Sequence, residues 1–303
     1  MRDTPVLKFG GRTLQGLRRF GPDEERLLQI CKQQESVNDI YRLLAERRNI
    51  ARSQRLHQIA RDFIQPLMDE GRTPVVVVSA FDWATDKLSQ LAGCLCPEPY
   101  PREYARLLMS GELRANAALS ITLRAQGIHA RSLTGREAGI VTESGPVDGR
   151  IAKVHKGYIM EMLDNDIVPV VAGFQGYYYD QDHQRDEVSI LGRGGSNQTA
   201  VALADALGQK ECFMLSDVDG VYDKDPNEYD DAKKLDRING RKMMKMKPFP
   251  QVIQKEAVEY ALESNVSIWV RSGFDPKLSG TKIVCTEEEL QEMQAEAEKQ
   301  KEQ

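Results

Sequence analysis

A lysine followed by two glycines near the start of the chain can bind phosphate. Lys8-Phe9-Gly10-Gly11 ends a short apolar run that reads as a strand. Successive glycines expose backbone N–H groups that cradle phosphate oxygens, and the lysine adds a positive charge. The spacing matches neither a P-loop nor a dinucleotide GxGxxG motif. Taken alone, this pattern is as typical of a tight turn as of a phosphate site.

A second glycine motif, Gly192-Arg193-Gly194-Gly195-Ser196, opens a predicted helix. Helix N-termini attract anions, and an arginine can bind a carboxylate through two parallel hydrogen bonds. The alternative is a glycine-rich turn with an exposed arginine. Because loop, arginine and helix start coincide, an anion site is favoured. Asn197 follows at a position where an anionic, amine-bearing substrate would favour an acid.

A third motif, Ser216 to Tyr222 (SDVDGVY), is followed by Asp225-Pro226. Asp217 and Asp219, at alternate positions, could support a magnesium ion or a ribose; the alternative is a solvated Asp-Gly turn. Two further segments contain polar side chains suited to a small substrate. They are Ser79 with Thr85-Asp86, where Thr85 could instead cap a helix, and Glu112, which faces either a ligand amine or solvent.

Four of these five segments directly follow apolar runs that predict strands. Strand patterns cover 5–9, 75–80, 129–133, 167–174, 212–216 and, as the last strand, 266–270, with a hairpin at 176–191. Helical spacing runs through the charged stretch 23–70 and through 85–91, 104–125, 153–164, 196–207 (capped by Ser196) and 251–263. Alternating strands and helices predict an α/β fold with a mostly parallel sheet. Because carboxyl ends of parallel strands share one edge, the motifs should form one active site.

Composition excludes several other classes of protein. The 303 residues are 41% hydrophobic and 29% charged, typical of a soluble globular chain. A net charge of −5 disfavours nucleic-acid binding, and Val75–Val78 is too short to span a membrane. No signal peptide is visible, and five scattered cysteines indicate reduced thiols. We therefore expect a cytoplasmic protein.

Taken in order, the motifs resemble aspartate kinase, of the amino-acid kinase family. The matching segments run from about Pro5 to Val284: KFGG (8–11), VVVVSA with TD (75–80, 85–86), GE (111–112), LTGREAGIVT (133–142), GFQG (173–176), LGRGGS (191–196), TAVAL (199–203), DVDGVY (217–222), DP (225–226), KLDRI (234–238), AVEYA (257–261) and VRS (270–272).

The resemblance implies a three-layer α/β/α sandwich with a mostly parallel central sheet. It implies a catalytic domain over 1–285, with a substrate lobe at about 1–190 and a nucleotide lobe at about 191–285. A charged tail, solvated as a helix or frayed, occupies 286–303, and no ACT regulatory domain that senses lysine or threonine is expected. The implied reaction, in amino-acid biosynthesis, is phosphorylation of the aspartate side-chain carboxylate by ATP with Mg²⁺. The implied assembly is a homodimer through the catalytic domain.

The resemblance also implies a role for each matching residue. Lys8 and Asp217 would be catalytic, with Lys8 stabilising the transferred phosphoryl group and magnesium held largely by the ATP phosphates. The remaining expected site residues are Gly10, Gly11, Gly194 and Gly195 for phosphate; Ser79, Thr85, Glu112, Arg193, Ser196 and Asn197 for substrate; and Ser216, Asp217, Tyr222 and Asp225 for nucleotide.

Four departures from the usual family pattern leave alternatives open. Asn197 replaces an aspartate, Arg12-Thr13 replaces Thr-Ser, and Phe81 to Ala84, with Trp83, replaces a small glycine-containing turn. Gln251 stands where a nucleotide-contacting lysine is usual, and Lys245 or Lys247 could take its place. A sister kinase acting on a modified or N-blocked aspartate is therefore one alternative, and a non-catalytic paralogue is another.

Overall fold

The computed structural model describes residues 3–15, 37–81, 83–143, 145–192, 194–226, 228–246, 249–250 and 252–299, with the backbone alone described for 37–47 and Ala297. Arg193, Lys247 and Gln251, singled out above, lie outside the described residues. So do the first part of the charged stretch, up to residue 36, and the last four residues of the tail. Within the described part, no helix is long and apolar enough to cross a membrane.

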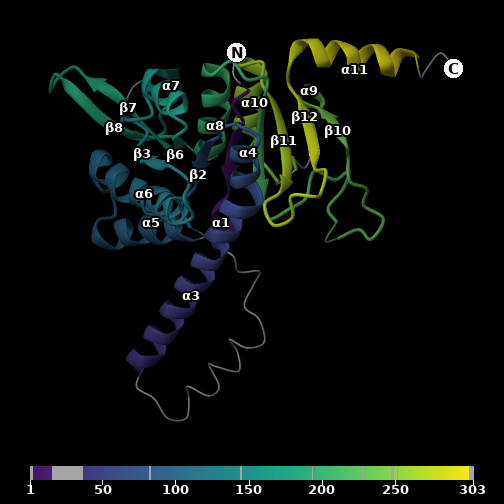
Figure 1. Ribbon diagram of the computed structural model, residues 1–303. Coiled ribbons are helices and arrows are strands. Elements are labelled where there is room, and N and C mark those ends of the chain that lie inside the picture. Colours follow the sequence, from purple (N-terminus) through teal and green to yellow (C-terminus); the bar gives the residue numbers. More distant parts are fainter. Residues whose placement is uncertain are drawn as a thin grey trace.

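An eight-stranded sheet forms the centre of the molecule (Figure 1). Its order is β10 (Arg237–Asn239), β12 (Thr281–Val284), β11 (Ser267–Ser272), β9 (Glu211–Ser216), β1 (Val6–Phe9), β2 (Val75–Val78), β6 (Val168–Ala172) and β3 (Ala130–Leu133). The run from β11 to β3 is parallel throughout, whereas β12 is antiparallel to β11. The chain goes from β1 to β2 on one side and returns to β9 on the other, so β1 lies at a topological switch point.

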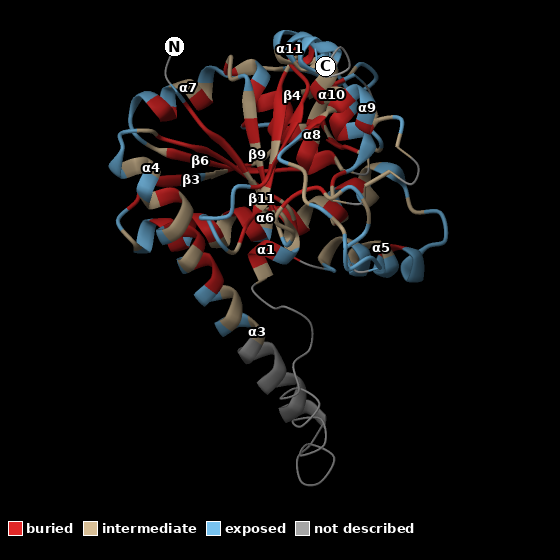
Figure 2. Cartoon of the chain, turned by 90° about the vertical axis from the view of Figure 1, so that its right-hand side faces the viewer, coloured by how far each residue is buried: buried red, intermediate tan, exposed pale blue. Residues whose placement is uncertain are grey.

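Alternate residues of the buried strands supply two separate cores. Val6, Val75 and Val77 pack in one cluster with apolar residues of α7 (Gly157–Asp164), α8 (Gly195–Ala206) and α10 (Lys255–Glu263). Leu7, Phe9, Val76 and Val78 pack in the other with α6 (Pro101–Ala125) and with the helical run between β1 and β2. Figure 2 shows this buried centre between exposed outer helix faces. The expected α/β/α sandwich is confirmed.

The charged stretch after β1 forms one helical run from Val37. It comprises α3 (Val37–Ile59), a π-helical turn η1 (Ala60–Ile64) and α4 (Gln65–Asp69). Pro66 lacks the N–H that would continue the regular ladder, which is consistent with the π-helical turn directly before it. The C-terminal turns of α3 pack on the sheet, and its N-terminal part extends away from the body (Figure 1).

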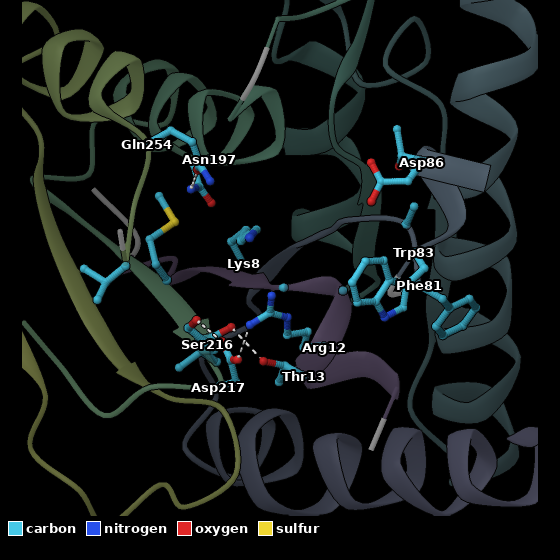
Figure 3. A pocket seen from close by; sticks show the side chains of 17 residues that line it. Lys8, Arg12, Thr13, Phe81, Trp83, Asp86, Asn197, Ser216, Asp217 and Gln254 are labelled. Atoms are coloured by element: carbon cyan, nitrogen blue, oxygen red, sulfur yellow. Dashed lines mark hydrogen bonds and ion pairs between the residues drawn. The ribbon is translucent and has the colours of Figure 1, made fainter. Parts of the chain in front are cut away.

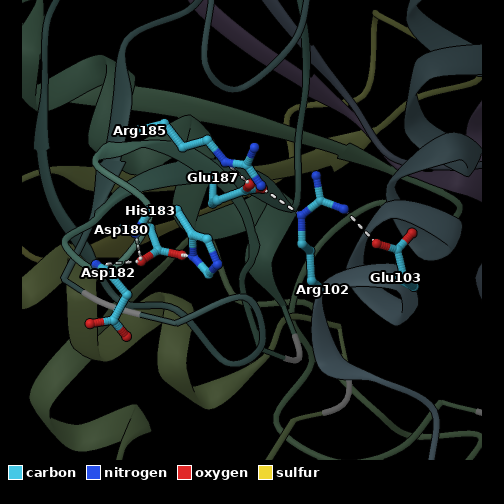
Figure 4. A network of polar contacts seen from close by, with 7 residues as sticks. All are labelled: Arg102, Glu103, Asp180, Asp182, His183, Arg185 and Glu187. Atoms are coloured by element: carbon cyan, nitrogen blue, oxygen red, sulfur yellow. Dashed lines mark hydrogen bonds and ion pairs between the residues drawn. The ribbon is translucent and has the colours of Figure 1, made fainter.

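A second sheet, ordered β5 (Ile151–Val154), β4 (Ile140–Thr142), β7 (Gln175–Asp180) and β8 (Arg185–Ile190), lies beside the first. The predicted hairpin is its β7–β8 pair. Arg102 of α6 donates from Nε to buried Glu187 of β8 at 2.7 Å, and Arg185 pairs with the other carboxylate oxygen (Figure 4). These contacts fasten the hairpin to α6. Next to α6 packs α5 (Ala84–Leu95).

Several sequence-based boundaries were wrong. The helix predicted at 153–164 begins only at Gly157, because Lys153 belongs to β5. The helix predicted at 251–263 begins at Lys255. Strand 266–270 is not the last one, since β12 follows and is completed by pairing with β11 and β10. Ser196 does not cap its helix: Gly194 is the N-cap, with φ 77°. The tail forms α11 (Glu287–Lys299), which follows β12. The short helix α9 (Gly240–Met243) directly follows β10.

Candidate active site

A cleft of about 330 Å³ opens at the carboxyl ends of β1, β2 and β9. Its walls come from the turn after β1, the loop after β2, the end of β9, the start of α8 and the segment before α10. Figure 3 shows Lys8 near its centre, between Asn197 and Gln254 on one side and Arg12, Ser216 and Asp217 on the other. The cleft is lined by Lys8, Gly10, Gly11, Arg12, Thr13, Ala80, Phe81, Trp83, Thr85, Asp86, Asn197, Met214, Leu215, Ser216, Asp217, Val252 and Gln254.

Lys8 lies in β1, so the central sheet fixes the position of this cation. A Cβ atom added to Gly10 would lie 3.6 Å from the Lys8 Nζ, so the ammonium group sits over the glycine turn. Burial lowers the pKa of Lys8 to about 8, and the nearby Asp217 carboxylate partly opposes that shift. At neutral pH the lysine is therefore charged and poorly hydrated, a state that favours an incoming phosphate oxygen.

Asp217 lies opposite the glycine turn and joins it through an ion pair. The Arg12 Nη1 donates to its Oδ2 at 3.0 Å, and the Ser216 hydroxyl donates to Oδ1 at 3.1 Å. Partial burial raises the pKa of Asp217, but these hydrogen bonds and the Arg12 charge outweigh burial and leave the pKa below its usual value. Asp219 is engaged elsewhere, because it accepts from the Tyr222 hydroxyl and from Lys234.

Asn197, in the first turn of α8, is buried, and within the described part of the chain only the nitrogen of its side-chain amide has a hydrogen-bond partner. It is 6% exposed, and its Nδ2 donates to the Gln254 Oε1 at 2.6 Å. Its Oδ1 has no hydrogen-bond partner among the described residues. Gln254 also packs over the glycine loop, since a Cβ on Gly194 would lie 2.7 Å from the Gln254 Cβ. Asn197 therefore presents a buried acceptor in the wall of the cleft that a ligand donor can satisfy.

Glu112 of α6 is a second buried acceptor. It is 3% exposed, and its Oε1 accepts from the backbone N–H of Ala80, which lines the cleft, at 3.1 Å. Its Oε2 has no partner in the described part of the chain. Burial raises the pKa of Glu112 to about 7, although the Ala80 hydrogen bond opposes this. Gly111 permits this close approach, because a Cβ there would meet the Ala80 Cβ at 2.9 Å.

The structure brings only some of the predicted site residues into the cleft. Those that line it are Lys8, Gly10, Gly11, Thr85, Asn197, Ser216 and Asp217. Ser79 donates its backbone N–H to Phe9 at the sheet edge, and Gly194 forms the N-cap of α8.

Glu112 does not line the cleft itself and lies behind Ala80, to whose N–H it is bonded. Four other predicted residues lie near these elements but do not line the cleft either. Ser196 packs against Gly173, and Gly195 packs under Leu191 and Phe174. Tyr222 bonds Asp219, and the carbonyl of Asp225 accepts from two backbone N–H groups of the turn that follows it.

Sequence reasoning missed Gln254 as a contact of Asn197. The two residues are 57 positions apart, and no local pattern links them. Met214 and Val252 also line the cleft, and neither was among the predicted site residues. Trp83 was noted only as a departure. It lines the cleft, is 62% exposed and has a left-handed backbone with φ 62°, which is unfavourable for a bulky residue.

Metal-binding capacity is limited in the residues that the structure describes. They contain no group of three His, Cys, Asp or Glu side chains able to hold a metal ion. Asp217 is the carboxylate at the end of β9. A single carboxylate at this place fits Mg²⁺ that is bound mainly through nucleotide phosphates.

A family comparison decides what kind of protein this is. The model of the amino acid kinase family matches residues 3–290. The chain belongs to the amino acid kinase family. Within this family, it is similar to the aspartokinase of Mycobacterium tuberculosis H37Rv, with 38% identity over 237 residues, covering 78% of this chain and 55% of the relative. The aspartokinase of Corynebacterium glutamicum is 39% identical over 223 residues, covering 73% and 51%. The chain thus spans about half the length of these relatives.

Solved structures of amino acid kinases share the fold. The aspartate kinase from Synechocystis superposes with a TM-score of 0.70 at 31% identity, covering 93% of this chain and 40% of that chain. E. coli aspartokinase III, in complex with aspartate and ADP, has a TM-score of 0.62 at 22% identity, covering 94% and 65%. An isopentenyl phosphate kinase has a TM-score of 0.57 at 20% identity, covering 93% and 100%. The last two comparisons show the amino acid kinase fold alone.

Proposed function

We propose that this chain catalyses the ATP-dependent phosphorylation of the side-chain carboxylate of L-aspartate, giving 4-phospho-L-aspartate and ADP. The observation that carries the proposal is a cleft lined by Lys8, by the adjacent turn at Gly10 and Gly11, and by Asn197. The side-chain oxygen of Asn197 is a buried hydrogen-bond acceptor. The first feature suits a phosphoryl group and the second suits a polar acceptor substrate. The 38% identity to an aspartokinase supports the choice of aspartate.

The proposed reaction needs positioning and charge neutralisation more than proton transfer. A substrate carboxylate is ionised at neutral pH, so one of its oxygens attacks the γ-phosphorus without a general base. The new O–P bond forms as the bond to the β-phosphate oxygen breaks, and ADP leaves with that electron pair. Lys8 stabilises the charge spread over the transferred phosphoryl oxygens, and N–H groups of the Gly10–Gly11 turn hold phosphate oxygens.

The substrate ammonium group would satisfy the buried acceptors. The Glu112 Oε2 and the Asn197 Oδ1 both lack partners among the described residues. An ammonium offers three donors, and its charge favours ionised Glu112, whose pKa would fall from about 7 on binding. Arg193 would bind the α-carboxylate, and Thr85, Ser79 and Ser196 would complete the acceptor site.

Nucleotide would occupy the side of the cleft formed by the end of β9. Ser216 and Asp217 line the cleft there, and Tyr222 and Asp225 follow in the next loop. Gly194 and Gly195 would approach the phosphates at the start of α8. Mg²⁺, held mainly by the ATP phosphates, would neutralise charge on the transferred group. Asp217 would contribute to catalysis from this side. Arg12, which pairs with Asp217, would exchange that carboxylate for a phosphate of the nucleotide and so supply a positive charge there.

The decisive experiment is a hydroxamate trap of the acyl phosphate, run with ATP over a panel of acids. We expect product from L-aspartate, and loss of at least a hundred-fold in kcat with Lys8→Met in a protein whose thermal unfolding is unchanged. Turnover of N-acetyl-aspartate in place of aspartate would establish the sister kinase instead. Absence of ADP release with every acid would establish a non-catalytic paralogue. A homodimer is part of the proposal, and light scattering at the monomer mass would remove it.

A further inference from the structure

Arg55, near the C-terminal end of α3, is a buried arginine that contacts two segments distant from it in the sequence. It is 3% exposed. Its Nε donates to the carbonyl of Thr13 at 2.8 Å, its Nη2 donates to the carbonyl of Gly273, and its Nη1 donates to the Gln58 side chain at 2.7 Å. Its guanidinium lies over the Phe274 ring, 4.3 Å from the centroid. The cation therefore joins residues 42 and 218 positions away.

The two segments contacted by Arg55 adjoin the candidate active site. Thr13 lies in α1 (Gly11–Gln15), directly after the glycine turn, and lines the cleft. Gly273 follows β11, and its N–H donates to the carbonyl of Ser216 at 2.7 Å. The two segments also touch, because a Cβ on Gly273 would lie 2.3 Å from the Thr13 Cγ2. Arg55 thus fixes the glycine turn relative to the end of β9.

Burial of the Arg55 guanidinium charge is unfavourable unless other interactions compensate for it. Burial lowers the pKa of Arg55 to about 10, although the charge of Asp62 opposes the shift, so the guanidinium is charged at neutral pH. Its hydrogen bonds described above go to two carbonyl groups and one amide, not to a carboxylate. A methionine of similar length would avoid the desolvation penalty. What the methionine could not do is hold both carbonyl groups.

Arg52, one turn earlier on α3, contacts α1 and the loop after β2. Its Nη2 donates to the Gln15 side chain at 3.2 Å, and its guanidinium lies 4.9 Å from the centroid of the Phe81 ring. Phe81 lines the cleft beside Thr85. Two arginines of α3 therefore contact α1, Arg55 at Thr13 and Arg52 at Gln15, and Arg52 also reaches Phe81 in the loop after β2.

We infer that Arg55 is a positioning residue that holds the glycine turn and the loop after β11 in the arrangement required for phosphoryl transfer, and that α3 is the element that delivers it. The inference rests on the proposed function for its kinetic consequence but not for its structural one. Loss of Arg55 frees α1 relative to β9, so the N–H groups at Gly10 and Gly11 and the ammonium of Lys8 no longer align on one phosphoryl group.

The test compares Arg55→Met and Arg55→Lys with Arg61→Met. Arg61 belongs to the same helical run but is exposed and pairs with Asp62 at its surface, so it is the matched control. The measurements are kcat, KM for ATP, KM for aspartate, ADP binding by calorimetry, and amide hydrogen exchange of peptides covering 10–15 and 273–278. Because exchange and calorimetry need no turnover, they test Arg55 even if aspartate proves not to be the substrate.

Arg55→Met is expected to lower kcat/KM for ATP about ten- to a hundred-fold, with KM for aspartate changed less than three-fold. Amide hydrogen exchange should become faster in the peptides covering 10–15 and 273–278 and stay unchanged in β2 and α8. Arg55→Lys, which keeps one charged donor, should recover part of the loss, and Arg61→Met should match wild type. If Arg55→Met does not fold, the lysine variant carries the test. The inference would be overturned by unchanged amide hydrogen exchange in both peptides, or by equal increases in KM for ATP and KM for aspartate.

Discussion

The side-chain amide of Asn197 donates to the side-chain carbonyl of Gln254 at 2.6 Å, joining the first turn of α8 to the N-cap residue of α10. This contact fixes the amide plane of Asn197, and its Oδ1 is thereby the atom left for a ligand. The polarity of one wall of the cleft is therefore set by a pair of neutral amides.

Removing Gln254 should weaken substrate binding without touching the nucleotide. We expect Gln254→Leu to raise KM for aspartate about five-fold, corresponding to about 1 kcal/mol, because Asn197 loses the hydrogen bond that orients it. In the double variant with Asn197→Leu, the two effects should be non-additive, since both remove one interaction. Steady-state kinetics of the four proteins give the coupling. Strict additivity would show that the amide pair does not act as a unit.

Asn197→Asp should shift selectivity toward a free amine. In the wild type Asn197 donates to Gln254. A carboxylate at this position can instead accept from the Gln254 amide once that amide has rotated, and it presents a charged oxygen to an ammonium. The ratio of kcat/KM for aspartate to that for N-acetyl-aspartate should rise about ten-fold, within the range for a hydrogen bond to a charged group. The same panel assay measures it, with wild type alongside. An unchanged ratio would mean that residue 197 does not contact the amine.

Activity should decline at alkaline pH as Lys8 loses its proton. Because the pKa of Lys8 in the ligand-free protein is lowered to about 8, kcat/KM for ATP should fall above that pH. The profile of kcat should fall at a higher pH, since bound phosphate raises the pKa of the lysine. In Lys8→Arg the alkaline limb should disappear, because a guanidinium stays charged. A limb that persists in the arginine variant would assign it to another group.

Glu112→Gln should stabilise the ligand-free protein at alkaline pH while impairing substrate binding. The folded pKa of about 7 lies above the unfolded value of 4.5, so the folded state binds more protons between these pH values and loses stability as pH rises. The full loss, about 3 kcal/mol, is present above pH 7 and absent below pH 4.5. The difference in Tm between variant and wild type should therefore grow from pH 5 to pH 8, and KM for aspartate should rise. A pH-independent difference would contradict this.

Two glycine-to-alanine changes should have opposite effects on stability. At Gly195 the new Cβ would lie 2.6 Å from the Leu191 Cβ, and such overpacking costs about 1–3 kcal/mol. At Gly93, within α5, nothing lies within 4 Å, so alanine should stabilise the helix by about 0.5–1 kcal/mol. Denaturant unfolding of both variants checks this. Unchanged stability of the Gly195→Ala variant would show that helix α8 shifts to accommodate the methyl group.

The local sequence was enough to predict most of the central sheet and the edge where the site lies. Val75–Val78 is a fully apolar run, and such runs form strands that are buried on both faces whatever their neighbours. The Lys8–Gly11 and Ser216–Asp217 motifs follow strands, and the parallel topology brings both to one edge. The helices at 104–125 and 196–207 were found because their apolar faces have a clear helical period.

Tertiary structure decided what no local pattern contains. Short strands such as β5 and β12 exist because a partner strand satisfies their backbone groups, so pairing, not composition, determines them. The contacts of Asn197 with Gln254 and of Arg55 with Gly273 link residues 57 and 218 positions apart. The low pKa of Lys8 and the high pKa of Glu112 arise from burial by the assembled fold. Residue type thus determined which chemistry is available, and packing determined which atoms are buried, paired or left for a ligand.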